Sequence, residues 1–393
     1  MIRSQLKSRP ITGWVLYDLA NTVFALGVIG LYFPAFLLDS GGRDGALALA
    51  EAGAGIAVIF LAPRIGGVTD RSGRRLPWLA VTTGIAVVTT AFLGSVPLFG
   101  SLLLLALGLV GFNLGSAIYD ALLPSVSTVE TRARISGRGV GIGYLGSFLG
   151  LGLGRFVLEV LDGNYRGVFV SLAAAFVLFA IPIFVWVKES PPVNRVERPL
   201  GLLAAWRAAR SVPGMVRFLI GRFLYTDAIN TLIGGFLALF VITELGLSTS
   251  AVNTLLAIAI AAAIAGGFLG GRLTEIWGPR RSLRLVLLLW TAAIIAGIVA
   301  AAFDVPDLVW IVGVLGGVAL GATWASDRVL MLELSPPDRI GEFYGLYAIM
   351  GRFATILSPL LWALIVDVLG LGRLVAMAAL AGFVLAGWWV LRR

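Results

Sequence analysis

The chain has 393 residues, of which 59% are hydrophobic and only 13% are charged, whereas soluble domains are about half apolar and a quarter charged. So little charge cannot coat a soluble surface, and most of the chain must therefore face lipid or other apolar helices. The sequence contains no Cys and no His, which excludes disulfides, imidazole bases and Cys/His zinc sites. We expect a polytopic membrane protein without enzymatic activity, metal or cofactor, in which only Asp and Glu can carry protons.

Apolar stretches of the length needed to cross a bilayer, about 17–25 residues, occur twelve times. They are predicted at 12–37, 46–66, 78–96, 100–123, 137–160, 167–187, 216–243, 249–271, 284–303, 308–334, 342–366 and 371–391. With the N-terminus inside, the outer loops carry only Arg43, Arg166 and Arg373 of the 30 Lys and Arg residues. This positive-inside pattern predicts cytoplasmic termini and a multi-pass protein of the cell (inner) membrane, and it explains the net charge of +9 without nucleic acid.

The longest polar break, residues 188–215, divides the predicted spans into six and six. We therefore expect an N-terminal six-helix bundle at 1–187, a cytoplasmic linker at 188–215 and a C-terminal six-helix bundle at 216–393. Within the linker, residues 200–210 are predicted to form a short amphipathic helix at the inner interface.

Three patterns recur between the halves in corresponding spans, at offsets between about 205 and 209 residues. Gly66-x3-Asp70-x2-Gly73-x-Arg75 returns as Gly271-x3-Glu275-x2-Gly278-x-Arg280, Asp18-x2-Asn21-Thr22 as Asp227-x2-Asn230-Thr231, and Gly111-x3-Gly115 as Gly317-x3-Gly321. A nearly constant offset in all three is hard to reach by chance and is typical of transporters built from internal repeats.

Several of these stretches resemble a known family. Residues 66–75 resemble the loop signature between spans two and three of the major facilitator superfamily. Residues 13–21, the Arg-Leu-Pro-Trp ending at Trp78, residues 143–146, residues 224–227 and the run from Ser326 to Tyr347 resemble, more specifically, the vacuolar-effluxer-like ("unknown major facilitator") family. The resemblance implies an all-α membrane fold of twelve helices in two pseudo-symmetric bundles. It also implies secondary transport, with eukaryotic relatives associated with amino-acid efflux from the vacuole.

The first signature has a physical interpretation of its own. Asp70 lies near the inner end of span two, where the positive N-terminus of a neighbouring span could stabilise it, and arginines beside it can bridge to acids on adjacent helix ends. We expect a cytoplasmic gate, with plain positive-inside topology as the alternative. Its residues are Gly66, Asp70, Arg71, Gly73, Arg74 and Arg75, with Glu275 and Arg280 in a second copy.

Charged residues inside spans cost about 2.5–3.5 kcal/mol each on insertion scales and are therefore functional candidates. Asp18, Asn21 and Thr22 share one helix face, because they are three and four residues apart, and Asp227 and Asn230 repeat that face. We expect both faces to meet at a central cavity as a solute site or proton carrier. The alternative is that each Asp holds a helix end or pairs with a nearby Arg.

Further candidates lie at the level of spans four, ten and eleven. Asp120 and the Asp327-Arg328 pair occupy corresponding depths, and Arg352 could reach that level. We expect Arg328 or Arg352 to neutralise a carboxylate or to bind an anionic substrate group, with a structural ion pair as the alternative. Arg222, near the inner start of span seven, is expected to snorkel to the interface. Candidate cavity-lining aromatics are Tyr17, Tyr144 and Trp324.

Together these features predict a monomeric secondary active transporter that works by alternating access. Its partners would be the lipid bilayer, a small polar solute and a proton or cation; an amino-acid-like solute is favoured and a sugar is the second candidate. The sequence contains no phosphate-binding Walker loop, which argues against direct ATP coupling. A lipid or lysolipid flippase on the same fold is the alternative function.

Overall fold

A computed structural model describes residues 9–189, 202–354 and 357–392. Its contacts divide the chain into two compact units, one of Met1–Ala208 with Ser335–Ala348 and one of Ala209–Leu334 with Ile349–Arg393. The segment Ser335–Ala348 therefore groups with the N-terminal half although it follows span ten in sequence. The division into bundles around residues 188–215 stays a prediction.

The described residues form helices and contain no strand. In chain order the helices are α2 (Arg9–Thr22), η1 (Val23–Tyr32), α3 (Phe33–Asp39), α4 (Asp44–Ser72), α5 (Leu76–Phe92), α6 (Leu98–Ala121), α7 (Leu123–Val126), α8 (Arg132–Gly143), α9 (Leu145–Arg155), η2 (Phe156–Val160), α10 (Tyr165–Trp186), α11 (Leu202–Ser211), α12 (Met215–Thr231), η3 (Leu232–Phe236), α13 (Leu237–Leu245), α14 (Thr249–Trp277), α15 (Pro279–Ala302), α16 (Leu308–Leu334), α17 (Ile340–Phe353), α18 (Leu357–Ala363), η4 (Leu364–Val368) and α19 (Arg373–Val390). The label η marks a π-helical stretch.

Ten helical runs within the described residues are long and apolar enough to cross a membrane. Of the other two predicted spans, the third corresponds to α5, which is apolar but 17 residues long. The seventh corresponds to the consecutive segments α12, η3 and α13. The chain is thus a multi-pass membrane protein by length and composition, while the number twelve and the side of the termini stay predictions.

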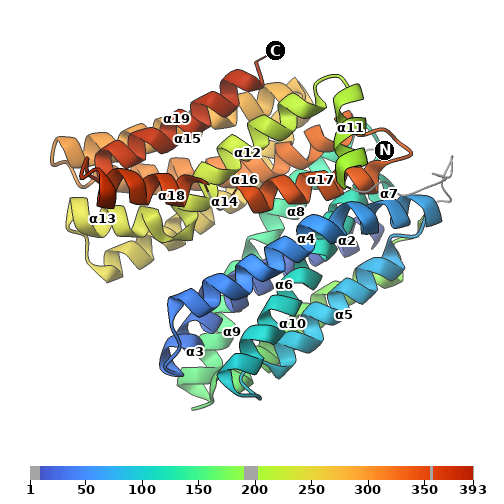
Figure 1. Cartoon of the computed structure of the whole chain (residues 1–393), viewed down its shortest axis with the longest axis horizontal. Helices are drawn as coiled ribbons and strands as arrows, with labels where there is room; N and C mark the ends of the chain where they lie inside the picture. The colour runs from blue at the N-terminus through green and yellow to red at the C-terminus, as the bar shows by residue number, and fades with distance from the viewer. Residues whose placement is uncertain (1–8, 190–201, 355–356, 393) are drawn as a thin grey trace. The chain divides into compact units, whose positions relative to one another are not determined.

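In the N-terminal unit, α2 packs against α8 and α10, and α6 packs against α4 and α5 (Figure 1). Large aromatic side chains fill its core, because rings bury much apolar area and stack on one another. Tyr119 stacks on Trp14 with ring centroids 4.6 Å apart and on Tyr17 at 5.0 Å. This layer joins α2 to α6.

In the C-terminal unit, α16 packs against α14 and α15, and α19 against α12 and α15 (Figure 1). Glycines set the closest approach, since a Cβ on Gly317 or Gly321 would collide with backbone carbonyls of α14. In the other copy, a Cβ on Gly111 would lie 2.7 Å from the carbonyl oxygen of Thr82. The glycine repeat in spans four and ten is therefore a helix-packing face in both halves.

Candidate functional site

Asp70, in the last turn of α4, is buried and accepts three hydrogen bonds. Its Oδ1 accepts from the Arg75 guanidinium at 2.6 Å and from the backbone N–H of Gly341 at 2.8 Å, while its Oδ2 accepts from the N–H of Glu342 at 2.9 Å. Gly341 and Glu342 lie in the first turn of α17, whose N–H groups have no partner within the helix. The expectation that a helix N-terminus stabilises Asp70 is confirmed, and the helix is the one that begins span eleven.

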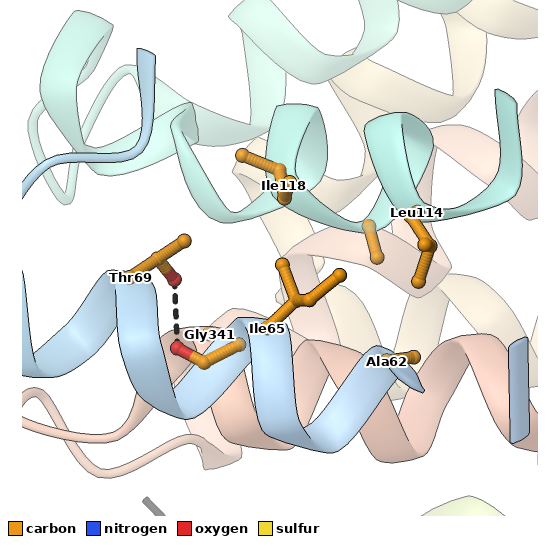
Figure 2. Close-up of a pocket in the computed structure, with 8 residues that line it drawn as sticks. Ala62, Ile65, Thr69, Leu114, Ile118 and Gly341 are labelled. Carbon is orange, nitrogen blue, oxygen red and sulfur yellow. Dashed lines mark hydrogen bonds between the residues drawn. The ribbon is translucent and has the colours of Figure 1, made fainter. Parts of the chain in front are cut away.

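Glycines bring α4 and α17 close enough for this bond. A Cβ on Gly66 would collide with the carbonyl of Gly341, and a Cβ on Gly345 would lie 2.8 Å from the carbonyl oxygen of Ala62. Thr69 donates its hydroxyl to the carbonyl of Gly66 at 2.7 Å, as the dashed line in Figure 2 marks. The two helices therefore touch backbone to backbone just before Asp70.

A small cavity of about 10 Å³ remains beside this contact, lined by α4, α6 and Gly341 of α17 (Figure 2). Ile65 of α4 and Ile118 of α6 both line it, and Ile65 points from α4 toward α6 in Figure 2. The space holds about one water molecule. The gate region is therefore packed shut within this unit and leaves no room for a solute.

The remaining gate residues behave differently from one another. Arg75 pairs with Asp70, whereas the exposed Arg71 and Arg74 form no ion pair with any residue that the structure describes. Gly73 takes the left-handed conformation (φ 63°) that ends α4, as a glycine does readily. Of the three arginines, only Arg75 is therefore seen to bridge, and Arg339 adds a pair with the buried Glu342 at 3.0 Å.

Glu189, which follows α10, is a participant that sequence reasoning missed. Its carboxylate accepts the backbone N–H of Arg75 and, at 3.0 Å, the N–H of Leu76. It thus holds the N-terminus of α5 in the way that Asp70 holds α17, from the segment that follows α10. The signal in the sequence was an acid in a basic inner segment, in which Glu189 and Glu197 are the two acids.

In the second copy of the gate motif, the acid has a partner on its own helix. Glu275 pairs with Arg272 on the same helix at 3.2 Å, and these side chains are 23% and 59% exposed. Gly278 ends α14 with φ 78°, and Arg280 follows in the first turn of α15. A latch made by this copy stays a prediction.

Asp18 lies at the packing surface of α2 with α8. A Cβ on Gly139 would lie 2.8 Å from Asp18 Oδ2, and one on Gly143 would lie 3.4 Å from the Asp18 carboxyl carbon. The glycines of span five therefore make room for this carboxylate. Asp18 and Asn21 are each 9% exposed, so the acid is held inside the N-terminal unit against another helix.

The other aromatic and acidic candidates of the same unit differ in exposure. Tyr17 is 1% exposed, and its hydroxyl forms a 2.6 Å hydrogen bond with Thr83, which makes it a core residue and argues against a cavity-lining role. Asp120, next to the stacked Tyr119, is buried at 9% exposure. Tyr144 is half-buried at the break between α8 and α9.

Asp227 is fully buried in α12 and forms hydrogen bonds with α18. It accepts the backbone N–H of Ser358 at 2.7 Å and also the hydroxyl of Ser358. Ser358 lies in α18, so this carboxylate joins α12 to α18 within the C-terminal unit. Asn230, nearly one turn further along α12, donates to the carbonyl of Ala354 at 3.4 Å.

Arg222 and Asp327 form an ion pair in which both side chains are buried. The Arg222 guanidinium also lies over the half-buried ring of Trp324, 5.7 Å from its centroid, a cation–π geometry. The expectation that Arg222 snorkels to the interface was therefore wrong, because Asp327 supplies a counter-charge in the core. Arg328 is buried and Arg352 half-buried, and their roles stay predictions.

π-helical stretches follow the polar face in both halves. Thr22 and Thr231 each donate to the carbonyl four residues earlier, those of Asp18 and Asp227, at 2.9 and 2.8 Å. The next residue begins η1 in one half and η3 in the other. Threonine bonds of this kind bend helices, and π segments gather at functional sites. The two halves therefore change from α-helical to π-helical geometry at the same position of the repeat.

A family model described as "Vacuole effluxer Atg22 like" matches residues 54–392. The chain belongs to this family. Among curated relatives, an uncharacterized MFS-type transporter of Bacillus subtilis, YxiO, is 26% identical over 91% of this chain and 88% of its own length. Autophagy-related protein 22 of Yarrowia lipolytica is 27% identical, but over 60% of this chain and 46% of its own length.

Solved structures agree on the fold of this Atg22-like chain. The human organic anion transporter MFSD10 matches with a TM-score of 0.77 and 16% identity over 98% of both chains. The major facilitator superfamily transporter FucP, in its outward conformation, matches with a TM-score of 0.75 and 12% identity over 98% of this chain and 97% of its own. These likenesses show the major facilitator fold, and the Atg22-like chain is a membrane transporter rather than an enzyme.

Proposed function

We propose that this chain is a secondary active transporter of the cell (inner) membrane that moves a small polar solute, most favourably an amino acid, by alternating access coupled to a proton or cation. The family description, a vacuole effluxer, supports solute transport and weighs against the lipid flippase. FucP, the fucose:proton symporter of E. coli, has the same fold. That likeness supports proton coupling and keeps a sugar as the second substrate class.

The observation that carries the proposal is the bond between Asp227 and the start of α18. A fully buried carboxylate is costly in a membrane, and here it accepts hydrogen bonds from the backbone N–H and the hydroxyl of Ser358 in α18. Protonation removes that charge and weakens the charge-assisted bonds. A proton on Asp227 would therefore loosen α18 relative to α12, which couples a proton to the shape of span eleven.

Asp18 is the matching acid in the first half. It lies against the glycine face of α8, as Asp227 lies against Ser358 of α18. Both acids precede a threonine-linked π stretch. We assign the solute site to the faces that carry Asp18, Asn21, Asp227 and Asn230, with Asp120, Arg328 and Arg352 as neighbouring candidates.

The Asp70 contact gives the transport cycle a cytoplasmic latch. Asp70 and Arg75 hold the first turn of α17, while Asp227 holds α18 further along the same span. A state open to the cytoplasm requires the Asp70 bonds to break, and the backbone contact at Gly66 to part. The outward conformation of FucP gives a precedent on the same fold for the opposite stage, in which the cytoplasmic side is closed.

The experiment begins with thermal-shift screening of the purified protein against the twenty amino acids, with glucose, xylose and nucleosides as the other arms. Any compound that stabilises the protein is then followed, radiolabelled, in proteoliposomes with and without a pH gradient. We expect Asp227→Asn to abolish gradient-driven accumulation while counterflow exchange remains. Asp367→Asn, which changes an exposed acid at the far end of span eleven, should behave as the native protein.

Accumulation by Asp227→Asn at the native level would remove Asp227 from coupling. If no compound moves under a pH or sodium gradient while the protein is folded, the transporter assignment itself is wrong.

A further inference from the structure

A basic pocket of about 450 Å³ opens where α14 ends, α15 begins and α16 ends. It lies wholly inside the C-terminal unit and, by the positive-inside pattern, at the cytoplasmic side. Its lining includes three cationic side chains, Arg280, Arg281 and Arg284, against one acidic side chain, Glu333. An excess of positive charge around a concave surface favours an anionic ligand.

Two of these arginines have no acidic partner. Within the part of the chain that the structure describes, neither Arg281 nor Arg284 forms an ion pair. Arg284 instead lies over the ring of Trp388, 5.0 Å from its centroid, and its Nε is buried without a hydrogen-bond partner. The pocket therefore offers cationic groups that the protein itself leaves open.

The first half shows what occupies the matching position. There the carboxylate of Glu189 lies on the N–H groups of Arg75 and Leu76 at the start of α5. The start of α15 follows the second copy of the same motif, 205 residues later, and lines the open pocket. An anion from outside the chain would take the place that an internal carboxylate has in the other repeat.

The surroundings favour a lipid as the source of that anion. Trp277 lines the pocket and is 45% exposed, and Ile276 and Leu285 on the adjoining helices are 57% and 42% exposed. Aromatic residues with exposed apolar neighbours are typical of the level where headgroups meet acyl chains. The acyl chains of a lipid would contact these exposed apolar side chains, whereas a soluble anion would not.

We propose that this pocket binds the phosphate group of an anionic phospholipid of the cytoplasmic leaflet, with Arg281 and Arg284 as the main contacts. The helix N-terminus of α15 adds its partial positive charge, and Arg280 adds a third cation. The acyl chains would then lie along the exposed residues Ile276 and Leu285. The site is separate from the acids assigned to transport, and it stands whether or not those assignments hold.

The test is native mass spectrometry of the delipidated full-length protein with phosphatidylglycerol, and with phosphatidylcholine as the zwitterionic lipid of zero net charge. A basic residue near a membrane surface contributes about fivefold to binding of anionic lipid, so R281Q/R284Q should weaken phosphatidylglycerol binding about 20-fold. R281K/R284K, which keeps both charges, should restore most of it. The matched control R43Q/R166Q removes two exposed arginines of the predicted outer loops and should change binding less than about threefold.

Size-exclusion and melting profiles check that each variant is folded. Equal phosphatidylglycerol binding by folded R281Q/R284Q and the native protein overturns the proposal. Equal affinity of the native protein for phosphatidylcholine also overturns it, because the headgroup charge would then play no part. Displacement of phosphatidylglycerol by millimolar inorganic phosphate, with equal stabilisation by phosphate alone, overturns the lipid assignment in favour of a soluble phosphate.

Discussion

The inner ends of spans two and eight carry the same motif and have different surroundings. In the first copy, Asp70 is enclosed by Arg75 and the start of α17, and Glu189 covers the start of α5. In the second copy, Glu275 has a partly exposed partner on its own helix, and the start of α15 borders an open pocket of about 450 Å³. In the first copy, the carboxylates and the helix N-termini have partners within the chain. Beside the second copy, Arg281 and Arg284 form no ion pair with any residue that the structure describes.

This difference shows what the motif specifies. Its acid and glycine place a carboxylate at a helix end and turn the chain, since Gly73 and Gly278 both have positive φ. The partner of the carboxylate comes from whichever helix lies opposite. The local geometry is therefore the same in both copies, while the roles that we propose for them differ: a latch in the first copy and an anion site in the second.

The largest expected effect is a difference in stability between variants of the two acids of the motif, Asp70 and Glu275. Asp70→Asn removes the charge from three hydrogen bonds and leaves Arg75 without its partner, which should cost about 3 kcal/mol of stability. Glu275→Gln breaks a partly exposed pair and should cost less than about 1 kcal/mol. Thermal melting of both purified variants measures the difference directly.

The native chain has no cysteine, so the same comparison can be made by labelling. Ile118→Cys introduces a thiol at the small cavity beside the latch. Adding Asp70→Asn should increase its alkylation by a maleimide about tenfold, whereas adding Glu275→Gln should leave the rate unchanged. Similar rates in both double variants would contradict a latch at Asp70.

A smaller effect is expected from the backbone contact that supports the latch. Gly66→Ala places a methyl group against the carbonyl of Gly341, and forced overpacking of this kind costs about 1–3 kcal/mol. Gly84→Ala is the matched control, because a Cβ there meets nothing within 4 Å. Melting temperatures of the two variants should differ by several degrees, and equal values would refute close contact of α4 with α17.

Local properties of the chain could be predicted well from the sequence. The span predicted at 100–123 is α6, Leu98–Ala121, and the span predicted at 308–334 is α16 with the same bounds. Both could be predicted because an apolar run long enough to cross a bilayer can be recognised from the local sequence alone. The repeated polar face was also visible, since its spacing is local. The π stretches that follow Thr22 and Thr231 had no such signal.

Partners across the fold could not be predicted in this way. Asp70 and Gly341 are 271 residues apart, and Arg222 and Asp327 are 105 apart. Periodicity states which residues share a face but not which face lies opposite. Arg222 looked like an interfacial residue because it lies near a span end, and only the packing of α12 near α16 reveals its counter-charge. The sequence therefore indicated the acids of the site and left their partners open.

The smallest expected effect is the loss of stability when the charge of Glu189 is removed. Glu189→Gln weakens the bonds to the N–H groups of Arg75 and Leu76, and loss of a charge at a helix N-terminus costs about 0.3–1 kcal/mol. Glu159→Gln is the control, since its pair with Arg155 is exposed, with side chains 58% and 74% exposed, and should contribute little. Melting curves of both variants in detergent measure the cost.

Glu189→Ala goes one step further, because it leaves those N–H groups open beside Arg74 and Arg75 and so gives the first half the charge pattern of the second. If the two inner ends differ mainly by this one carboxylate, phosphatidylglycerol should stabilise Glu189→Ala more than the native protein, and phosphatidylcholine should not. Equal stabilisation of both proteins would mean that the pocket beside α15 depends on its own three arginines and not on an uncovered helix start. The helix dipole would then be a minor contributor to anion binding in either half.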